Sequence, residues 1–317
     1  MTVSVPRVSS VTVAFNPNPE RLAEQVCALL DQVERIIIVD NGSSPSVKEI
    51  LGGLGAARPE LNGPRIQVIA LESNKGVASG FNIGAREARS HGMEFMLLLD
   101  HDSVPGSDMV SLLVAAHRQC VALPGAHRVA AVGPRVNDLR DPHEYPFIRL
   151  GWLYNRRVRC VDAEQGVVAC DFLISSGSLI ALEVFAAVGE FDELLFIDSV
   201  DLEWCCRARA RQFTLYGVCA ALLDHRLGDH RRHLLSGTEM VVHSPQRIYY
   251  MTRNRILLYW RPYMPLKWKL KDLLRWPAKL FAIIVLVRPR LEYAQMAAWA
   301  IRDAVARRGG KFRGDEA

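Results

Sequence analysis

The stretch Phe95-Met-Leu-Leu-Leu-Asp100-His101-Asp102-Ser103 decides the fold. A short apolar run bounded by polar residues is typical of a strand buried on both faces, so the two acids are expected at its carboxyl end. Ligands of open α/β sheets bind at that edge, where two neighbouring carboxylates can hold a divalent cation against a phosphate. The alternative for an isolated Asp-x-Asp is a solvated turn.

Strand and helix patterns alternate before this stretch. Apolar runs at residues 11–15, 36–39 and 66–71 predict strands, and apolar residues at helical spacing between them predict helices. Four such alternations predict an α/β fold with a doubly wound, mostly parallel sheet. Asp40 follows the second strand, so Asp40 and Asp100 should line one edge of this sheet.

Three glycines follow the third predicted strand. Gly76, Gly80 and Gly84 stand four residues apart, so on a helix they form one bare stripe that permits close approach to a sheet or to a ligand. The segment is not Gly-x-Gly-x-x-Gly, and the chain contains no Gly-Lys-Ser/Thr phosphate loop. Dinucleotide-binding and P-loop functions therefore lose support.

The second half of the sheet follows a less regular region. Residues 134–166 contain several prolines and a basic run, and we predict a mobile loop over the site there. Strands are expected at 167–174 and 213–216, and helices at 182–188 and 200–211. The later helices and strands complete the sheet.

Acids crowd the start of the helix expected at 200–211. Asp198, Asp201 and Glu203 lie within six residues, and at least one of them is expected to do proton chemistry. One acid there would be ordinary complementarity to the helix dipole. His225 follows the last predicted strand; a lone histidine is more often structural than a ligand.

Charge is distributed unevenly along the chain of 317 residues, whose net charge is +5. Residues 1–225 carry 20 Lys and Arg against 27 Asp and Glu, a balance of −7, whereas residues 226–317 carry 19 against seven, a balance of +12. The two parts therefore face different partners, and the basic part suits nucleic acid or anionic lipid.

The cysteines and the N-terminal residues bear on the cellular compartment. The seven cysteines are scattered and include no Cys-x-x-Cys pair, so we expect reduced thiols in a cytosolic protein. Residues 1–7 show no basic segment followed by an apolar one, so a secretory signal peptide is not expected.

The basic C-terminal part has an amphipathic pattern. A helix is expected from Ser244 to Trp260, and beyond it lysines and arginines alternate with leucine, tryptophan and phenylalanine over residues 267–281. The longest wholly apolar run of this part, 280–287, is too short to cross a membrane, so the pattern favours an interfacial helix. Packing on the catalytic domain or in a dimer interface is the alternative, and no recognised module supports nucleic-acid binding.

With these pieces in order, the chain from about Thr12 to Asn254 resembles the family 2 inverting glycosyltransferases of the GT-A fold, within them the bacterial rhamnosyltransferase-like group. The resemblance rests on segments in the family's order: Val13-Ala-Phe15-Asn-Pro, Ile38-Val-Asp40-Asn41-Gly42-Ser43, Asn74-Lys-Gly76-Val-Ala-Ser-Gly-Phe-Asn82-Ile-Gly, Leu97-Leu-Leu-Asp100-His-Asp102-Ser103, Ser176-Gly177-Ser178, Gly189-Glu-Phe-Asp192-Glu193, Phe196-Ile-Asp198-Ser-Val-Asp201-Leu-Glu203-Trp-Cys-Cys-Arg207 and His225-Arg-Leu-Gly228.

The resemblance implies a two-domain organisation and a set of site residues. Residues 1–243 would form the GT-A catalytic domain and residues 244–317 a membrane-associating helical extension. Asp102 and His225 would ligate Mg²⁺ or Mn²⁺. The resemblance further implies these substrate-binding residues: Phe15, Asp40 (on the nucleotide base), Asn74, Gly76, Asn82, Asp100 (on ribose or sugar), Ser176, Gly177, Glu203, Arg253 and Asn254 (the last two facing the acceptor's diphosphate).

The general base is the point at which this sequence departs from the family. Asp201 matches the second position of the family's Glu-Asp pair, but Val200 occupies the Glu position and an additional acid, Asp198, stands just before it. Asp198 therefore competes with Asp201 for the role, and Glu203 is a third candidate.

The resemblance implies a metal-dependent enzyme that transfers L-rhamnose from dTDP-L-rhamnose to a lipid-linked saccharide in cell-surface polysaccharide synthesis, of the O-antigen or capsule type. It would work in the cytoplasm, peripheral on the inner face of the cytoplasmic membrane, without nucleic acid, and a homo-oligomer is compatible with the sequence. The alternatives are a UDP-hexose-dependent enzyme of the same family and a non-catalytic nucleotide-sugar-binding protein.

Overall fold

The computed structural model describes residues 6–122, 128–137, 145–162, 166–225, 230–233 and 239–316. Its strands and helices are β1 Val8–Ala14, α1 Pro19–Leu29, β2 Arg35–Asp40, α2 Val47–Leu54, β3 Ile66–Ala70, α3 Val77–Ser90, β4 Phe95–Asp100, β5 Val104–Pro105, α4 Met109–Ala122, β6 Arg128–Asn137, β7 Phe147–Arg149, β8 Arg156–Val158, β9 Val167–Cys170, β10 Leu179–Ala181, α5 Leu182–Val188, α6 Val200–Ala210, β11 Phe213–Asp224, β12 His230–His233, β13 Glu239–Val242, α7 Pro245–Tyr259, α8 Leu266–Leu286 and α9 Arg290–Val305.

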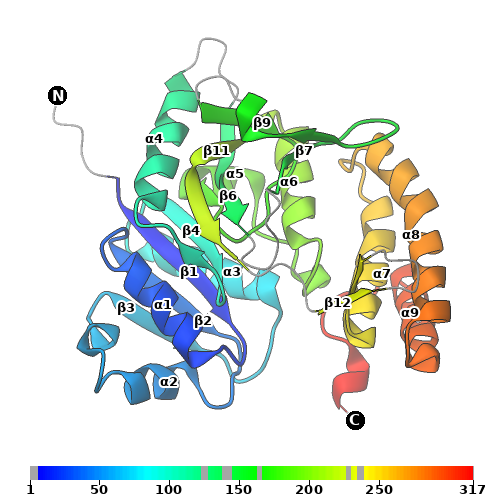
Figure 1. Ribbon diagram of the computed structural model, residues 1–317, viewed down its shortest axis with the longest axis horizontal. Coiled ribbons are helices and arrows are strands. Elements are labelled where there is room, and N and C mark those ends of the chain that lie inside the picture. The colour runs from blue at the N-terminus through cyan, green and yellow to red at the C-terminus, as the bar shows by residue number, and fades with distance from the viewer. Residues whose placement is uncertain are drawn as a thin grey trace.

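One nine-stranded sheet forms the centre of the molecule, in the order β3-β2-β1-β4-β10-β6-β11-β5 with β9 also on β11 (Figure 1). The first four strands are parallel, β10 runs antiparallel to both neighbours, and β6 and β11 are parallel again. The α/β fold with its mostly parallel sheet is confirmed. In the register, Asp40 and Asp100 lie opposite Ala14 and Val13 at the end of β1, so both acids are at one sheet edge as predicted.

Helices cover both faces of the sheet, and the sequence of β4 shows why. Phe95, Leu97 and Leu99 point into one apolar core, shared with α1, α2 and α4, and Met96 and Leu98 point into the other, shared with α3, α5 and α6. All five side chains are buried. A strand that is apolar at every position needs such a cover on both sides.

The glycine stripe of α3 packs against β1. A Cβ on Gly80 would lie 2.7 Å from Val13 Cγ1, and one on Gly84 would lie 2.1 Å from Val11 Cγ1. The absence of side chains at these two positions therefore lets the helix approach the central strand closely. Of the two roles that the stripe suggested, packing on a sheet is the one observed for Gly80 and Gly84.

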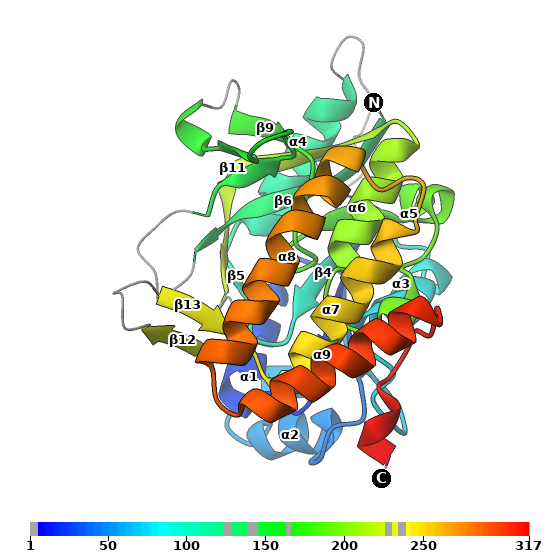
Figure 2. The same ribbon diagram turned by 90° about the vertical axis from the view of Figure 1, so that its right-hand side faces the viewer.

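The C-terminal helices α7, α8 and α9 form a layer on one side of the molecule, facing the viewer in Figure 2. Trp276, Leu280 and Ile283 of α8 pack with Ile248 of α7 and Tyr293 of α9 in a small core of their own. None of the described helices combines the length and hydropathy needed to cross a bilayer. The division of the chain at residue 243 stays a prediction.

Two expectations are wrong in the described part of residues 134–166 and nearby. In its described part the expected loop is a continuation of β6 and a β7–β8 hairpin, whose residues do not line the pocket described below. The remainder of the prediction, at 138–144 and 163–165, lies outside the described residues. Cys160 and Cys219, expected as reduced thiols, form a disulfide with a Cα–Cα distance of 5.5 Å. The two cysteines are 59 residues apart, so the sequence does not indicate this pairing. Their contact forms only when β11, which contains Cys219, packs in the sheet.

We expect Gly84→Ala to lower the free energy of unfolding by ~1–3 kcal/mol, because its methyl group overpacks the contact with Val11. Urea denaturation measures the change. Gly53→Ala in α2 is the matched control: no atom lies within 4 Å of its Cβ, so there the usual helix preference for alanine should stabilise by ~0.5–1 kcal/mol. Equal stability of Gly84→Ala and wild type would contradict this account of the stripe.

Candidate active site

A pocket of about 480 Å³ opens at the carboxyl ends of β1 and β4. Strand ends, the first turns of α3 and α6, and α7 all contribute to its wall. The lining residues are Val13, Phe15, Asn41, Asn74, Gly76, Val77, Asp100, His101, Asp102, Ile174, Ser175, Phe196, Ile197, Asp198, Ser199, Val200, Asp201, His225 and Arg247.

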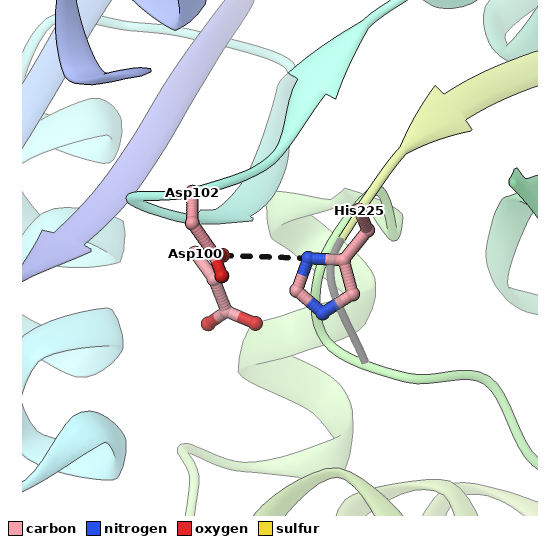
Figure 3. A group of neighbouring side chains, drawn as sticks. All are labelled: Asp100, Asp102 and His225. Atoms are coloured by element: carbon pink, nitrogen blue, oxygen red, sulfur yellow. Dashed lines mark ion pairs between the residues drawn. The ribbon is translucent and has the colours of Figure 1, made fainter. Parts of the chain in front are cut away.

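Asp100, Asp102 and His225 converge inside this pocket (Figure 3). Each offers a donor atom within 4.8 Å of the others, and His225 Nδ1 lies 3.4 Å from Asp102 Oδ1. The two acids come from the end of β4 and the turn after it, and the histidine follows β11. Two carboxylates and an imidazole are ligands that suit Mg²⁺ or Mn²⁺. Among the described residues this is the one group of at least three such side chains with this geometry.

The cluster is held by buried polar residues around it. Gln25 of α1 donates from Nε2 to the carbonyl oxygens of Asp100 and Ser103, at 2.6 Å each, and accepts from Thr12 Oγ1 at 2.9 Å. Ser103 Oγ lies 2.7 Å from His225 Nδ1 and 2.6 Å from Ser176 Oγ. Ser176 thus acts through the turn and the histidine.

The two carboxyl groups of the turn differ in acidity. Burial raises the pKa of Asp100 above its usual range. Burial also opposes ionisation of Asp102, but the hydrogen bond and charge of His225 outweigh it, so the pKa of Asp102 is lowered. Asp102 is therefore the more anionic of the two and the better anchor for a cation.

The candidate bases lie in the loop before α6 and in the first turn of that helix, and the loop has a strained conformation. Phe196, Asp198 and Ser199 have positive φ angles of 62°, 63° and 64°. Residues other than glycine rarely adopt this backbone conformation. Asp201, one residue into the helix, accepts a hydrogen bond from Leu202 N at 2.8 Å. Burial raises the pKa of Asp201 to about 6, although this hydrogen bond and one from Ser175 N oppose the shift.

Asp198 lies in the same pocket but is held by an ion pair. Arg247 of α7 donates to both carboxylate oxygens at 3.2–3.4 Å. Because these oxygens already accept from a guanidinium, Asp198 is less available than Asp201 to take a proton from a substrate. Arg247 was not identified as a site residue from the sequence, since only the packing of α7 on the loop brings it into the pocket.

Arg253 and Asn254, expected at the acceptor, are fully buried and do not line the pocket. Asn254 Nδ2 lies 2.7–2.9 Å from the carbonyl oxygens of Leu195, Ile197 and Asp198. Arg253 donates to two carbonyls of the same loop, at 3.1 Å each. This pair holds the strained loop from α7, and its expected contact with substrate stays a prediction.

Five further expected residues also lie outside the pocket lining, among them Ser176, whose hydroxyl contacts Ser103 as described above. Asp40 is buried, and its two oxygens accept from Ser43 N and Val47 N. Glu203 is buried in an ion pair with Arg207, and Asn82 binds the backbone of Phe191. Gly177 has a φ of 86°, and a Cβ there would lie 2.5 Å from Pro134. These contacts are structural, and a contact of these residues with substrate stays a prediction.

The remaining expected residues do meet in the pocket. Phe15 is 43% exposed at its mouth. Asn74 Oδ1 accepts from Gly76 N and from Asn41 Nδ2, so these three residues form one wall. Asn41 was missed as a site residue although it adjoins Asp40 in the quoted Asp-Asn-Gly-Ser motif; its position at the end of β2 was the available signal.

Comparison with known proteins agrees with this fold. The model of "Glycosyl transferase family 2" matches residues 9–173. The dTDP-rhamnosyl transferase RfbF of Shigella flexneri is 27% identical over 94% of this chain and 95% of its own, and the galactofuranosyltransferase GlfT1 of Mycolicibacterium smegmatis is 27% identical over 80% and 84%.

A solved structure of GalNAc-T7 with UDP, GalNAc and Mn²⁺ superposes with a TM-score of 0.59 at 15% identity, covering 96% of this chain and 57% of that longer one. This likeness supports the GT-A fold. Because the family model covers more than half of the sequence, including the strand that ends in Asp100 and the turn that carries Asp102, the chain belongs to glycosyl transferase family 2.

Proposed function

We propose that the protein is a metal-dependent inverting glycosyltransferase that moves L-rhamnose from dTDP-L-rhamnose to a lipid-linked saccharide. The observation that carries the proposal is the presence, in one pocket, of an Asp-Asp-His donor set and a separate carboxylate with a raised pKa. A protein that only binds a nucleotide sugar would not require this separate carboxylate.

Asp100, Asp102 and His225 are the residues that would hold Mg²⁺ or Mn²⁺. Their oxygen and nitrogen donors fit either ion. When bound, the cation would neutralise negative charge on the leaving diphosphate. The surrounding residues Gln25, Ser103 and Ser176 orient the donors before any ligand arrives.

Asp201 is the proposed general base. Its pKa of about 6 leaves the carboxylate ionised at neutral pH and basic enough to take the proton of an acceptor hydroxyl as that hydroxyl attacks the sugar C1. A single displacement of this kind inverts the configuration at C1. Asp198, in its ion pair with Arg247, would contribute a fixed charge beside the attacking group.

The choice of donor rests on the relative RfbF, a dTDP-rhamnosyl transferase by name, whose likeness extends over nearly the whole of both chains. The second candidate is a UDP-hexose donor. The relative GlfT1 is a galactofuranosyltransferase by name, which favours a hexose as the transferred sugar. In either case Asn41, Asn74 and Gly76 form the wall that would face the nucleotide.

The proposed setting is cell-surface polysaccharide synthesis on the inner face of the cytoplasmic membrane, with the basic C-terminal helices in peripheral contact with lipid. Support comes from the charge of +12 in residues 226–317. An acceptor linked to lipid requires the enzyme to work close to the bilayer. Nucleic acid has no role in this proposal.

Nucleotide binding tests donor and metal together. We expect dTDP with Mn²⁺ to raise the Tm more than UDP, GDP or CDP, since a ligand at a hundredfold excess over its Kd stabilises by ~2.7 kcal/mol. Asp102→Asn should remove the metal-dependent part of the shift, and the control Asp108→Asn, an exposed acid nearby, should retain it. A larger UDP shift would move the donor to a UDP-sugar, and no shift with any nucleotide would count against an enzyme.

Replacing the proposed base should abolish transfer without loss of donor binding. Asp201→Asn is expected to reduce kcat by ~10²–10⁴-fold, with a smaller reduction for the matched change Asp198→Asn. In wild type, kcat/KM should fall as the pH decreases through about 6, because the raised pKa of Asp201 means that the carboxyl becomes protonated there. The reverse order of the two variants would assign the base to Asp198.

Asn254→Asp tests the support of the strained loop. The variant keeps the shape of the side chain but replaces the donor group by an acceptor beside three carbonyl oxygens, so we expect a loss of ~1–3 kcal/mol in stability and a lower kcat. Thermal unfolding and steady-state assays measure both. Gln295→Glu, the same chemical change at an exposed position of α9, should change neither, and an unaffected Asn254→Asp would disprove the role.

A further inference from the structure

The outward face of α8 is apolar although it is exposed. Leu270 is 48% exposed, Leu274 77%, Phe281 70% and Val285 41%. These residues recur at intervals of four or seven positions along one side of the helix, whereas Trp276, Leu280 and Ile283 on the other side pack toward α7 and α9. This helix therefore presents two apolar faces, and only the inner one is covered by the described part of the chain.

The loop between β7 and β8 continues this apolar face. Trp152, Leu153 and Tyr154 at its tip are 64%, 80% and 73% exposed. Arg275 of α8 donates to the carbonyl oxygen of Leu153 at 3.3 Å, and Lys271 bonds Asn155, so the loop tip and the helix lie side by side. Figure 1 shows the loop reaching toward α8, and Figure 2 shows α8 in front of the helical layer.

Basic residues border this apolar surface. Arg156 and Arg157 are exposed on β8 directly after the loop, and Lys267, Lys271 and Arg275 lie on α8. The one acid within α8, Asp272, is mostly buried and binds Arg255 and Tyr259. The surface therefore combines exposed apolar side chains, three of them aromatic, with positive charge.

We propose that the β7–β8 loop tip and the outer face of α8 together form one membrane-binding surface for anionic phospholipid. The inference rests on the peripheral membrane contact proposed above and adds the hairpin as a second, non-helical anchor. Trp and Tyr prefer the headgroup region of a bilayer, and lysine and arginine reach anionic headgroups from its edge.

Charge decides between a bilayer and a second copy of the chain as the occupant. Symmetric pairing of two copies through this surface would bring its basic borders together, where like charges repel. An anionic bilayer instead complements both the apolar centre and the basic border. The β7–β8 loop tip and α8 are far apart in sequence but lie side by side. Together they form the extended apolar surface that contact with a bilayer requires.

Vesicle flotation of the full chain tests the proposal. Wild type should float with vesicles of phosphatidylcholine and phosphatidylglycerol, and weakly with phosphatidylcholine alone. The variant Trp152→Ser/Leu153→Ser/Tyr154→Ser and the variant Leu274→Gln/Phe281→Gln should each bind at least roughly tenfold more weakly, because each removes exposed apolar area from the surface. Val121→Ser, an apolar residue 54% exposed on α4, is the control and should bind as wild type.

Three results would overturn the proposal. Wild-type binding by the loop variant would remove the hairpin from the surface, equal binding to both vesicle types would remove the charge requirement, and a solution dimer that both variants convert to monomer would make the surface a protein interface. Circular dichroism verifies that the variants fold. The flotation readout needs no turnover, so a failure of the glycosyltransferase proposal and a failure of this one are distinguishable.

Discussion

The burial of β4 on both faces is the constraint on which the rest of the structure depends. Its five apolar residues alternate between two cores, so a shift of register by one residue would exchange those cores and move Asp100 into the sheet. The acids can therefore lie only where the strand ends. The parallel pairing of β1 with both β2 and β4 then places the ends of all three strands at one edge of the sheet, and the pocket opens there.

Buried amides and guanidinium groups turn this edge into a defined site. Gln25 satisfies two carbonyls of the Asp-His-Asp turn, and Asn254 satisfies three carbonyls of the loop before α6. The carbonyl oxygens of Asp100 and Leu195 also accept from Ser103 N and Ile197 N. A buried carbonyl that loses its last partner costs ~1–3 kcal/mol. The hydrogen bonds of Gln25 and Asn254 therefore stabilise two loops, one of which contains three strained residues, and so fix the positions of the carboxylates on these loops.

Much of the site follows from local patterns along the chain. The apolar strand before Asp100 and Asp102 predicted both the sheet edge and the pairing of these acids, and the acids near Val200 predicted a second group in the same pocket. The contacts that hold three expected site residues in the structure were not predicted, whether they are distant, as for Arg253 and Asn254, or lie within one helix, as for Glu203. Arg253, Asn254 and Glu203 carry polar groups that suit substrate, but α7 and α6 place those groups against the protein's own backbone and an arginine.

By itself, the sequence determined the α/β class, the strand that ends in the acids and the basic, amphipathic character of the C-terminal part, because each depends on the order of neighbouring residues. The tertiary structure alone decided that Arg247 pairs with Asp198, that Cys160 bonds Cys219, and that the β7–β8 loop lies beside α8. These contacts join residues 49 or more positions apart. No local periodicity records such a pairing, since it arises only when separate elements pack on the same sheet.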